Sequence, residues 1–200
     1  MGVTATQVKE LRDKTGAGFM DCKAALTESE GDLEQAVTIL RTRGQVRAAQ
    51  RFGRSTSQGL VGSYIHVGGQ VGVLVEVNCE SDFVVRTDEF QQLVREIAMH
   101  IAAASPLCVS RDQVPNEDIK REKAIFRAQF EASNKPAQVI DKIVEGKLVS
   151  YYQQIALLDQ PSIRDPKISI GDVVTAAIAK TGENITVRRF ARFKIGESAD

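Results

Sequence analysis

The sequence lacks several features that would point to particular functions. It has no tryptophan, and its 26 lysines and arginines balance its 26 aspartates and glutamates, so net charge indicates no partner. Cys22, Cys79 and Cys108 are odd in number, widely spaced and without a CxxC pair, which argues against a disulfide framework or a zinc site. We therefore expect a reducing, cytoplasmic environment, no metal and no cofactor.

Membrane-spanning features are absent as well. No apolar run approaches the roughly 20 residues that cross a bilayer, and the polar start MGVTATQVKE has no apolar stretch of the kind found in signal peptides. We expect no membrane partner and no direct DNA binding. What is present is ordinary for a folded protein, because 42% of the 200 residues are hydrophobic and 26% are charged. That composition supports one or two domains with buried cores.

Acidic residues are missing from one polar stretch of the chain. Residues 41–58 contain no aspartate or glutamate but five arginines, namely Arg41, Arg43, Arg47, Arg51 and Arg54. We interpret residues 45–58 as a linker that passes from helical to flexible. The alternative is an RNA- or ribosome-associated adaptor, because arginine binds phosphate groups. Phe52 is the only aromatic residue in this stretch, which weakens that alternative.

The first 44 residues have the pattern of a small helical domain. Thr4 is suited to cap a first helix, and the Thr15–Gly18 run ends it. A short second helix is expected over residues 21–27. A third begins after Gly31 and Asp32, with its apolar residues on one face and Gly44 beyond its end. Residues 1–44 are thus predicted to form a three-helix domain.

Residues 59–200 are predicted to form an α+β core. Two β-rich runs, 60–67 and 71–78, are separated by Gly68-Gly69-Gln70, a hairpin signal. A third strand is expected over residues 185–195, with its mostly apolar odd-numbered positions facing inward. Helical patterns occupy residues 88–102, 116–132, 136–144, 148–155 and 172–181, and Gly146 is expected to end the helix that follows Pro136. The prediction is a three-stranded antiparallel sheet with helices packed on it.

A loop is expected between a strand ending near Asn78 and a helix beginning near Asp88. We call four of its residues, Ser81, Asp82, Phe83 and Val84, the tip. A loop held by rigid elements at both ends is well placed to contact a partner. A large apolar side chain beside a carboxylate could insert into that partner. The alternative is structural: Phe83 covers the base of the sheet and Asp82 is a turn or capping residue.

Three separated blocks resemble the elongation factor Ts family. They are LRDKTGAGFMDCKAAL (residues 11–26), EVNCESDFV (residues 76–84), and a third block that runs from Lys135-Pro136 through KIVEGKLVSYYQQIALLDQP to the tail ENITVRRFARFKIGE. The resemblance implies a ubiquitin-associated-like N-terminal domain and a core that docks on elongation factor Tu. It also implies a guanine-nucleotide exchange factor in translation, not an enzyme. Such a factor binds the GDP form of its partner, displaces magnesium and releases GDP so that GTP can bind.

The same resemblance assigns residues to this contact. It implies that the tip enters near the magnesium and phosphate site of elongation factor Tu. It further implies that Arg12, Phe19 and Met20 touch the nucleotide domain and that His66 faces the phosphate-binding loop. The alternatives are that Phe19 or Met20 packs the small helical core and that His66 is an ordinary surface residue.

The sequence departs from the family pattern at the tip and in its length. Ser81 stands where threonine is usual, but it keeps the hydroxyl group. Val85 occupies a position where a smaller residue is common. The chain has one core unit where long members have two related halves, and this short form implies a homodimer.

Overall fold

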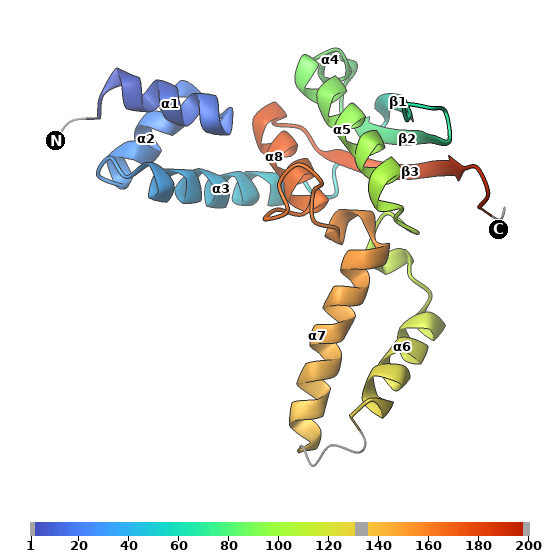
Figure 1. The fold of residues 1–200 in the computed structure, drawn as a ribbon. Helices are drawn as coiled ribbons and strands as arrows, with labels where there is room; N and C mark the ends of the chain where they lie inside the picture. The colour runs from blue at the N-terminus through green and yellow to red at the C-terminus, as the bar shows by residue number, and fades with distance from the viewer. Residues whose placement is uncertain (1–2, 131–135, 198–200) are drawn as a thin grey trace. The chain divides into compact units, whose positions relative to one another are not determined.

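The computed structural model describes residues 3–130 and 136–197 and confirms the α+β class (Figure 1). Its three strands form one antiparallel sheet in the order β1-β2-β3. The elements, in chain order, are α1 (Ala5–Thr15), α2 (Phe19–Glu28), α3 (Leu33–Ala49), β1 (Gln58–Ile65), β2 (Val71–Cys79), α4 (Asp82–Val85), α5 (Asp88–Ala104), η1 (Arg111–Gln113), α6 (Asn116–Ala128), α7 (Ala137–Ile155), η2 (Leu157–Asp159), α8 (Ile170–Thr181) and β3 (Ile185–Lys194). In this part of the chain no helix is both long and apolar enough to cross a membrane.

The chain divides into two compact units whose boundaries pass through α5, α8 and the sheet. The first unit contains the chain through Gly59, together with Asn78–Leu93 and Val174–Thr186. The second contains Leu60–Val77, Val94–Val173 and the chain from Val187 onward. The domain boundaries predicted at residues 44 and 58 stay a prediction.

The N-terminal helices α1, α2 and α3 pack into the predicted three-helix module. Thr4 and Gln7 form a capping box at the start of α1, and Gly16 ends that helix with a left-handed φ of 68°. Asp32 caps α3 by accepting hydrogen bonds from two backbone N–H groups. The core of the module consists of Val8, Leu11, Cys22, Ala25, Leu26 and Ala36.

The prediction that Gly44 lies beyond the third helix is wrong, because α3 continues to Ala49. A Cβ atom added at Gly44 would lie only 3.3 Å from the Cβ of Ala179 in α8. The absence of a side chain therefore allows α3 to approach α8 closely within the first unit. A glycine inside a helix costs only about 1 kcal/mol relative to alanine, which packing can offset.

In the second unit, the hairpin between β1 and β2 forms as predicted. His66 N donates to Val71 O at 2.9 Å, and Gly68 and Gly69 both have positive φ, as tight hairpin turns require. The odd-numbered β2 residues from Val73 onward are fully or almost fully buried. A Cβ atom at Gly62 would lie 2.2 Å from a methyl carbon of Val94, so α5 packs directly on this face of the sheet.

The opposite face of the sheet carries exposed apolar side chains, namely Val61, Ile65, Leu74, Phe193 and Ile195. The prediction that odd positions of the last strand face inward fails after Val187. Beyond that residue the partly buried positions are the even-numbered Phe190 and Arg192, and Arg192 Nε donates to Ala102 O of α5 at 3.4 Å. Phe193 is consequently 70% exposed.

Helices α6 and α7 lie side by side in the second unit (Figure 1). Lys123 pairs with Glu145 at 2.9 Å, and the ammonium group of Lys147 lies 5.4 Å from the ring centres of both Phe126 and Phe130. The predicted end at Gly146 is wrong, since α7 is continuous from Ala137 to Ile155. Buried residues on either side of Gly146 hold the helix together.

Candidate functional site

The tip forms a single helical turn, α4, and the prediction of a loop is corrected on this point. Ser81 is extended (φ −127°, ψ 158°) and precedes the turn, while Arg86 N donates to Phe83 O at 3.2 Å behind it. Thr87 Oγ1 also donates to Val84 O at 2.7 Å. Only two residues separate β2 from α4 and two separate α4 from α5, so the turn is held closely at both ends.

Phe83 and Val84, neighbours in this turn, differ sharply in exposure. Val84 is buried, at 8% exposed, whereas Phe83 is 76% exposed. The alternative that Phe83 covers the base of the sheet is therefore wrong. Val84 anchors the turn to the protein, and Phe83 is left available to a partner.

Asp82 is the first residue of α4, where an acidic side chain interacts favourably with the helix dipole. Arg86 Nη2 donates to Asp82 Oδ2 at 2.7 Å, one helical turn later. Both side chains are at least half exposed, and such surface ion pairs contribute about 0–1 kcal/mol. The Asp82 carboxylate can therefore exchange Arg86 for another cationic partner at little cost.

Two loops bind each other directly behind the tip. Glu183 Oε2 accepts from Ser81 N at 2.9 Å, and Glu183 Oε1 accepts from Ser81 Oγ at 2.5 Å. In the reverse direction, Glu80 Oε1 accepts from Asn184 N at 2.6 Å. We call these four residues the clasp. It joins the end of β2 to the turn between α8 and β3.

Cys79 lies beside the clasp and is a poor nucleophile. Its side chain is fully buried, and the thiol donates to Ser81 O at 3.1 Å. Burial, reinforced by the nearby Glu183 carboxylate, raises the pKa of the Cys79 thiol. The reactive form of cysteine is the thiolate, which this environment disfavours.

The three candidate contact residues of the helical module are all exposed. Arg12 lies on α1, and Phe19 and Met20 begin α2 with exposures of 50% and 71%. Neither belongs to the module's core, so the alternative that one of them packs there is wrong. The module and the tip belong to the same unit, where Lys180 lies beside Gly16 and pairs with Glu89 at 3.2 Å.

His66 belongs to the second unit, at the end of the β1–β2 hairpin. It is exposed, and its Nδ1 lies 3.0 Å from the hydroxyl oxygen of Tyr64. This hydrogen bond orients the imidazole ring on the surface. The structure does not group His66 in one unit with the other candidate residues.

The arginine-rich stretch makes ion pairs with the protein itself. Arg43 pairs with Glu28, and Arg47 donates to both carboxylate oxygens of Asp21 at 3.0 and 2.8 Å. The hydrogen bond from Arg47 lowers the pKa of Asp21. Arg54 also lies 3.5 Å from Glu80 of the clasp. These pairings leave the RNA-binding alternative without support.

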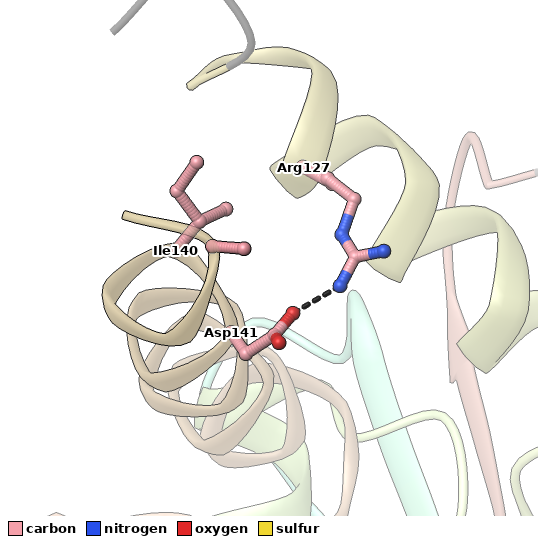
Figure 2. A pocket seen from close by; sticks show the side chains of 4 residues that line it. Arg127, Ile140 and Asp141 are labelled. Carbon is pink, nitrogen blue, oxygen red and sulfur yellow. Dashed lines mark hydrogen bonds and ion pairs between the residues drawn. The ribbon is translucent and has the colours of Figure 1, made fainter. Parts of the chain in front are cut away.

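A pocket between α6 and α7 offers no comparable chemistry. It is lined by Arg127, Ala137, Ile140 and Asp141. Figure 2 shows the guanidinium group of Arg127 paired with the carboxylate of Asp141 across it. Because its two charged groups satisfy each other, the pocket does not supply a ligand site.

The sequence did not single out the clasp residues Glu80, Glu183 and Asn184. They occur within the blocks that carry the family resemblance, but more than 100 residues separate the two sides of the clasp. No periodicity connects positions so far apart. The only local indication was a glutamate at each place: Glu80 directly before the tip and Glu183 at the start of the tail block.

An exposed aromatic residue on a rigid turn, together with an exposed apolar surface on a helical module, is typical of proteins that bind a macromolecular partner. The family model described as Elongation factor TS matches residues 5–197. Among similar proteins, the Elongation factor Ts of Koribacter versatilis is 54% identical over 197 residues, covering 98% of this chain and 90% of the relative. The Fervidobacterium nodosum and Geobacter sulfurreducens proteins of that name are 55% and 53% identical, covering 98% and 100% of this chain and 100% and 93% of their own lengths. The chain therefore belongs to the elongation factor Ts family of translation elongation factors.

Proposed function

We propose that the protein is a guanine-nucleotide exchange factor for elongation factor Tu and acts in the cytoplasm. It binds the GDP-bound partner, displaces magnesium and promotes GDP release, so that GTP can bind. The observation that carries the proposal is the exposed Phe83 on a braced helical turn, next to the Asp82 carboxylate. Family membership supports the choice of partner.

The mechanism is a shift in a binding equilibrium and requires no covalent step. A GTPase holds its nucleotide through magnesium and a loop of backbone N–H groups. Phe83 would repack the neighbouring partner helices, and Asp82 would disturb the magnesium shell. If these contacts form only with the nucleotide-free partner, they strengthen its binding to the exchange factor. Linkage then requires that they weaken the partner's affinity for GDP by the same factor. Each 1.4 kcal/mol of such contact weakens it about tenfold.

Two further surfaces support contact with the same partner. Arg12, Phe19 and Met20 would touch the nucleotide domain from the helical module, and their exposure makes them accessible. His66 would face the phosphate-binding loop from the hairpin. These assignments follow the family resemblance, and the exposure of each residue is compatible with them.

A homodimer is the proposed assembly of this short chain. The open face of an antiparallel sheet is ordinarily polar. Here apolar side chains from all three strands (Val61, Ile65, Leu74 and Phe193) are exposed on it, as is Ile195 just after β3, each at 49% or more. A second copy of the chain would cover this apolar face and supply the half that longer family members carry within one chain.

The direct test is nucleotide release from elongation factor Tu loaded with fluorescent GDP. The protein is expected to accelerate the fluorescence change at substoichiometric concentrations, because an exchange factor is released and acts again. A protein that failed to accelerate release even at high molar excess would not be an exchange factor for this partner.

A further inference from the structure

The clasp places two hydrogen bonds to an ionised carboxylate at the entrance to α4. A single carboxylate, that of Glu183, accepts from both the backbone N–H and the hydroxyl of Ser81. Hydrogen bonds to an ionised carboxylate are roughly twice as strong as neutral ones. Because they hold both its backbone N–H and its hydroxyl, they restrict the backbone and the side-chain rotamer of Ser81, the first residue of the tip.

The other half of the clasp makes its base rigid. Asn184 is 2% exposed and donates its backbone N–H to Glu80. Its side-chain Nδ2 donates to Arg54 O at 2.8 Å. Asn184, the next residue after Glu183, is thus buried and hydrogen-bonded to two other segments. These bonds restrict the movement of the backbone that carries the Glu183 carboxylate.

We propose that Glu183 is a positioning residue that acts through Ser81 to fix the direction in which α4 presents Phe83. This inference rests on the proposed exchange function. Binding orders flexible groups at a free-energy cost, and a group already ordered in the free protein avoids that cost. The clasp would order the tip before the partner binds. Less of the free energy of the Phe83 contact would then be lost to ordering the tip, and more would contribute to weakening nucleotide binding by the partner.

The clasp is compatible with serine in place of the usual threonine in the tip. The Ser81 hydroxyl is directed to Glu183 inside the protein, where its oxygen lies 2.5 Å from the carboxylate. Position 81 therefore requires a hydroxyl for an internal hydrogen bond, which serine and threonine both supply. Ser81→Thr should keep the bond, and Ser81→Ala should remove only that bond while leaving the backbone one.

The test is a double-mutant cycle on the stimulated release of fluorescent GDP from elongation factor Tu. Glu183→Ala is expected to slow release about five- to thirty-fold, the range that corresponds to ordering the backbone of one residue. In a Phe83→Ala background, Glu183→Ala should cause no further loss, because there is no longer a phenylalanine to position. Glu89→Ala removes a carboxylate of the same unit outside the tip and is the matched control, expected at the wild-type rate.

The outcomes separate this inference from the proposed function. If Phe83→Ala releases GDP at the wild-type rate, the role of the tip fails whatever Glu183 does. If Phe83→Ala is slow but Glu183→Ala is not, the positioning role is overturned. Equal losses from Glu183→Ala in both backgrounds would also overturn it, since they would show a general effect on the fold. Should Glu183→Ala not fold, Ser81→Ala replaces it in the cycle, with Ser81→Thr expected to restore the rate.

Discussion

Replacing Phe83 with alanine should leave the fold intact. The side chain is 76% exposed, so about a quarter of its surface is covered by the protein. Full burial of a phenylalanine is worth roughly 1.5–3 kcal/mol, and a quarter of that is below about 1 kcal/mol. By contrast, removing the fully buried ring of Phe90 should cost about 3–5 kcal/mol. Thermal or denaturant unfolding of the two variants measures this difference.

The same substitution should have a large effect on nucleotide exchange. An aromatic side chain that becomes buried at the centre of an interface typically contributes about 2–4 kcal/mol. If Phe83 makes this contact only with the nucleotide-free partner, Phe83→Ala should slow stimulated GDP release by about 30- to 1,000-fold. The effect on function would then greatly exceed the effect on stability, which is the expected signature of a contact residue.

The assay is stopped-flow release of fluorescent GDP from elongation factor Tu over a range of protein concentrations. Phe52→Ala is the matched control, since Phe52 is 64% exposed and lies outside the tip. It should lower stability by a similarly small amount and leave exchange near the wild-type rate. The reasoning is refuted if Phe83→Ala and Phe52→Ala release GDP equally fast, or if Phe83→Ala unfolds as readily as Phe90→Ala.

Three other changes test the second unit and the assembly. Burial lowers the pKa of His100. The free energy of unfolding should therefore fall as the pH drops below 6.5, because the histidine takes up a proton more readily in the unfolded chain than in the folded one. In denaturant titrations at a series of pH values, His100→Gln should show a weaker dependence of stability on pH in this range. Gly62→Val should destabilise the protein by about 1–3 kcal/mol, measured by urea unfolding, because its Cβ would collide with Val94; an unchanged midpoint would contradict the packing of α5 on β1. Leu74→Lys, at the centre of the open sheet face, should convert a dimer into a monomer in sedimentation velocity without loss of helix content, and a wild-type monomer at micromolar concentration would contradict the homodimer.

Local sequence signals were sufficient for much of the fold. The capping box of Thr4 and Gln7, the hairpin glycines Gly68 and Gly69, and the alternation of β2 all depend on residues within a few positions of one another. Their geometry follows from hydrogen bonds and steric limits inside one segment. For that reason the α+β class and the order of the elements were predictable.

Single glycines misled the prediction of helix ends. Gly44 and Gly146 both lie inside helices, because the small helical penalty of one glycine is outweighed by tertiary packing or by buried neighbours. The tip was predicted as a loop for a related reason. A helix of four residues is too short to show a periodic pattern, and only the bonds at its two ends reveal it.

By itself, the sequence determined the class of fold, the family and the position of the tip, because each depends on residues that are adjacent or regularly spaced. Tertiary structure alone decided that Phe83 is exposed, that three of the five arginines pair with acids of α2 and of the residue after β2, and that Glu183 holds Ser81. Those outcomes require segments that lie far apart in the chain to meet in space. The pairing of Ser81 with Glu183 exists only after the sheet has brought the end of β2 beside the start of β3.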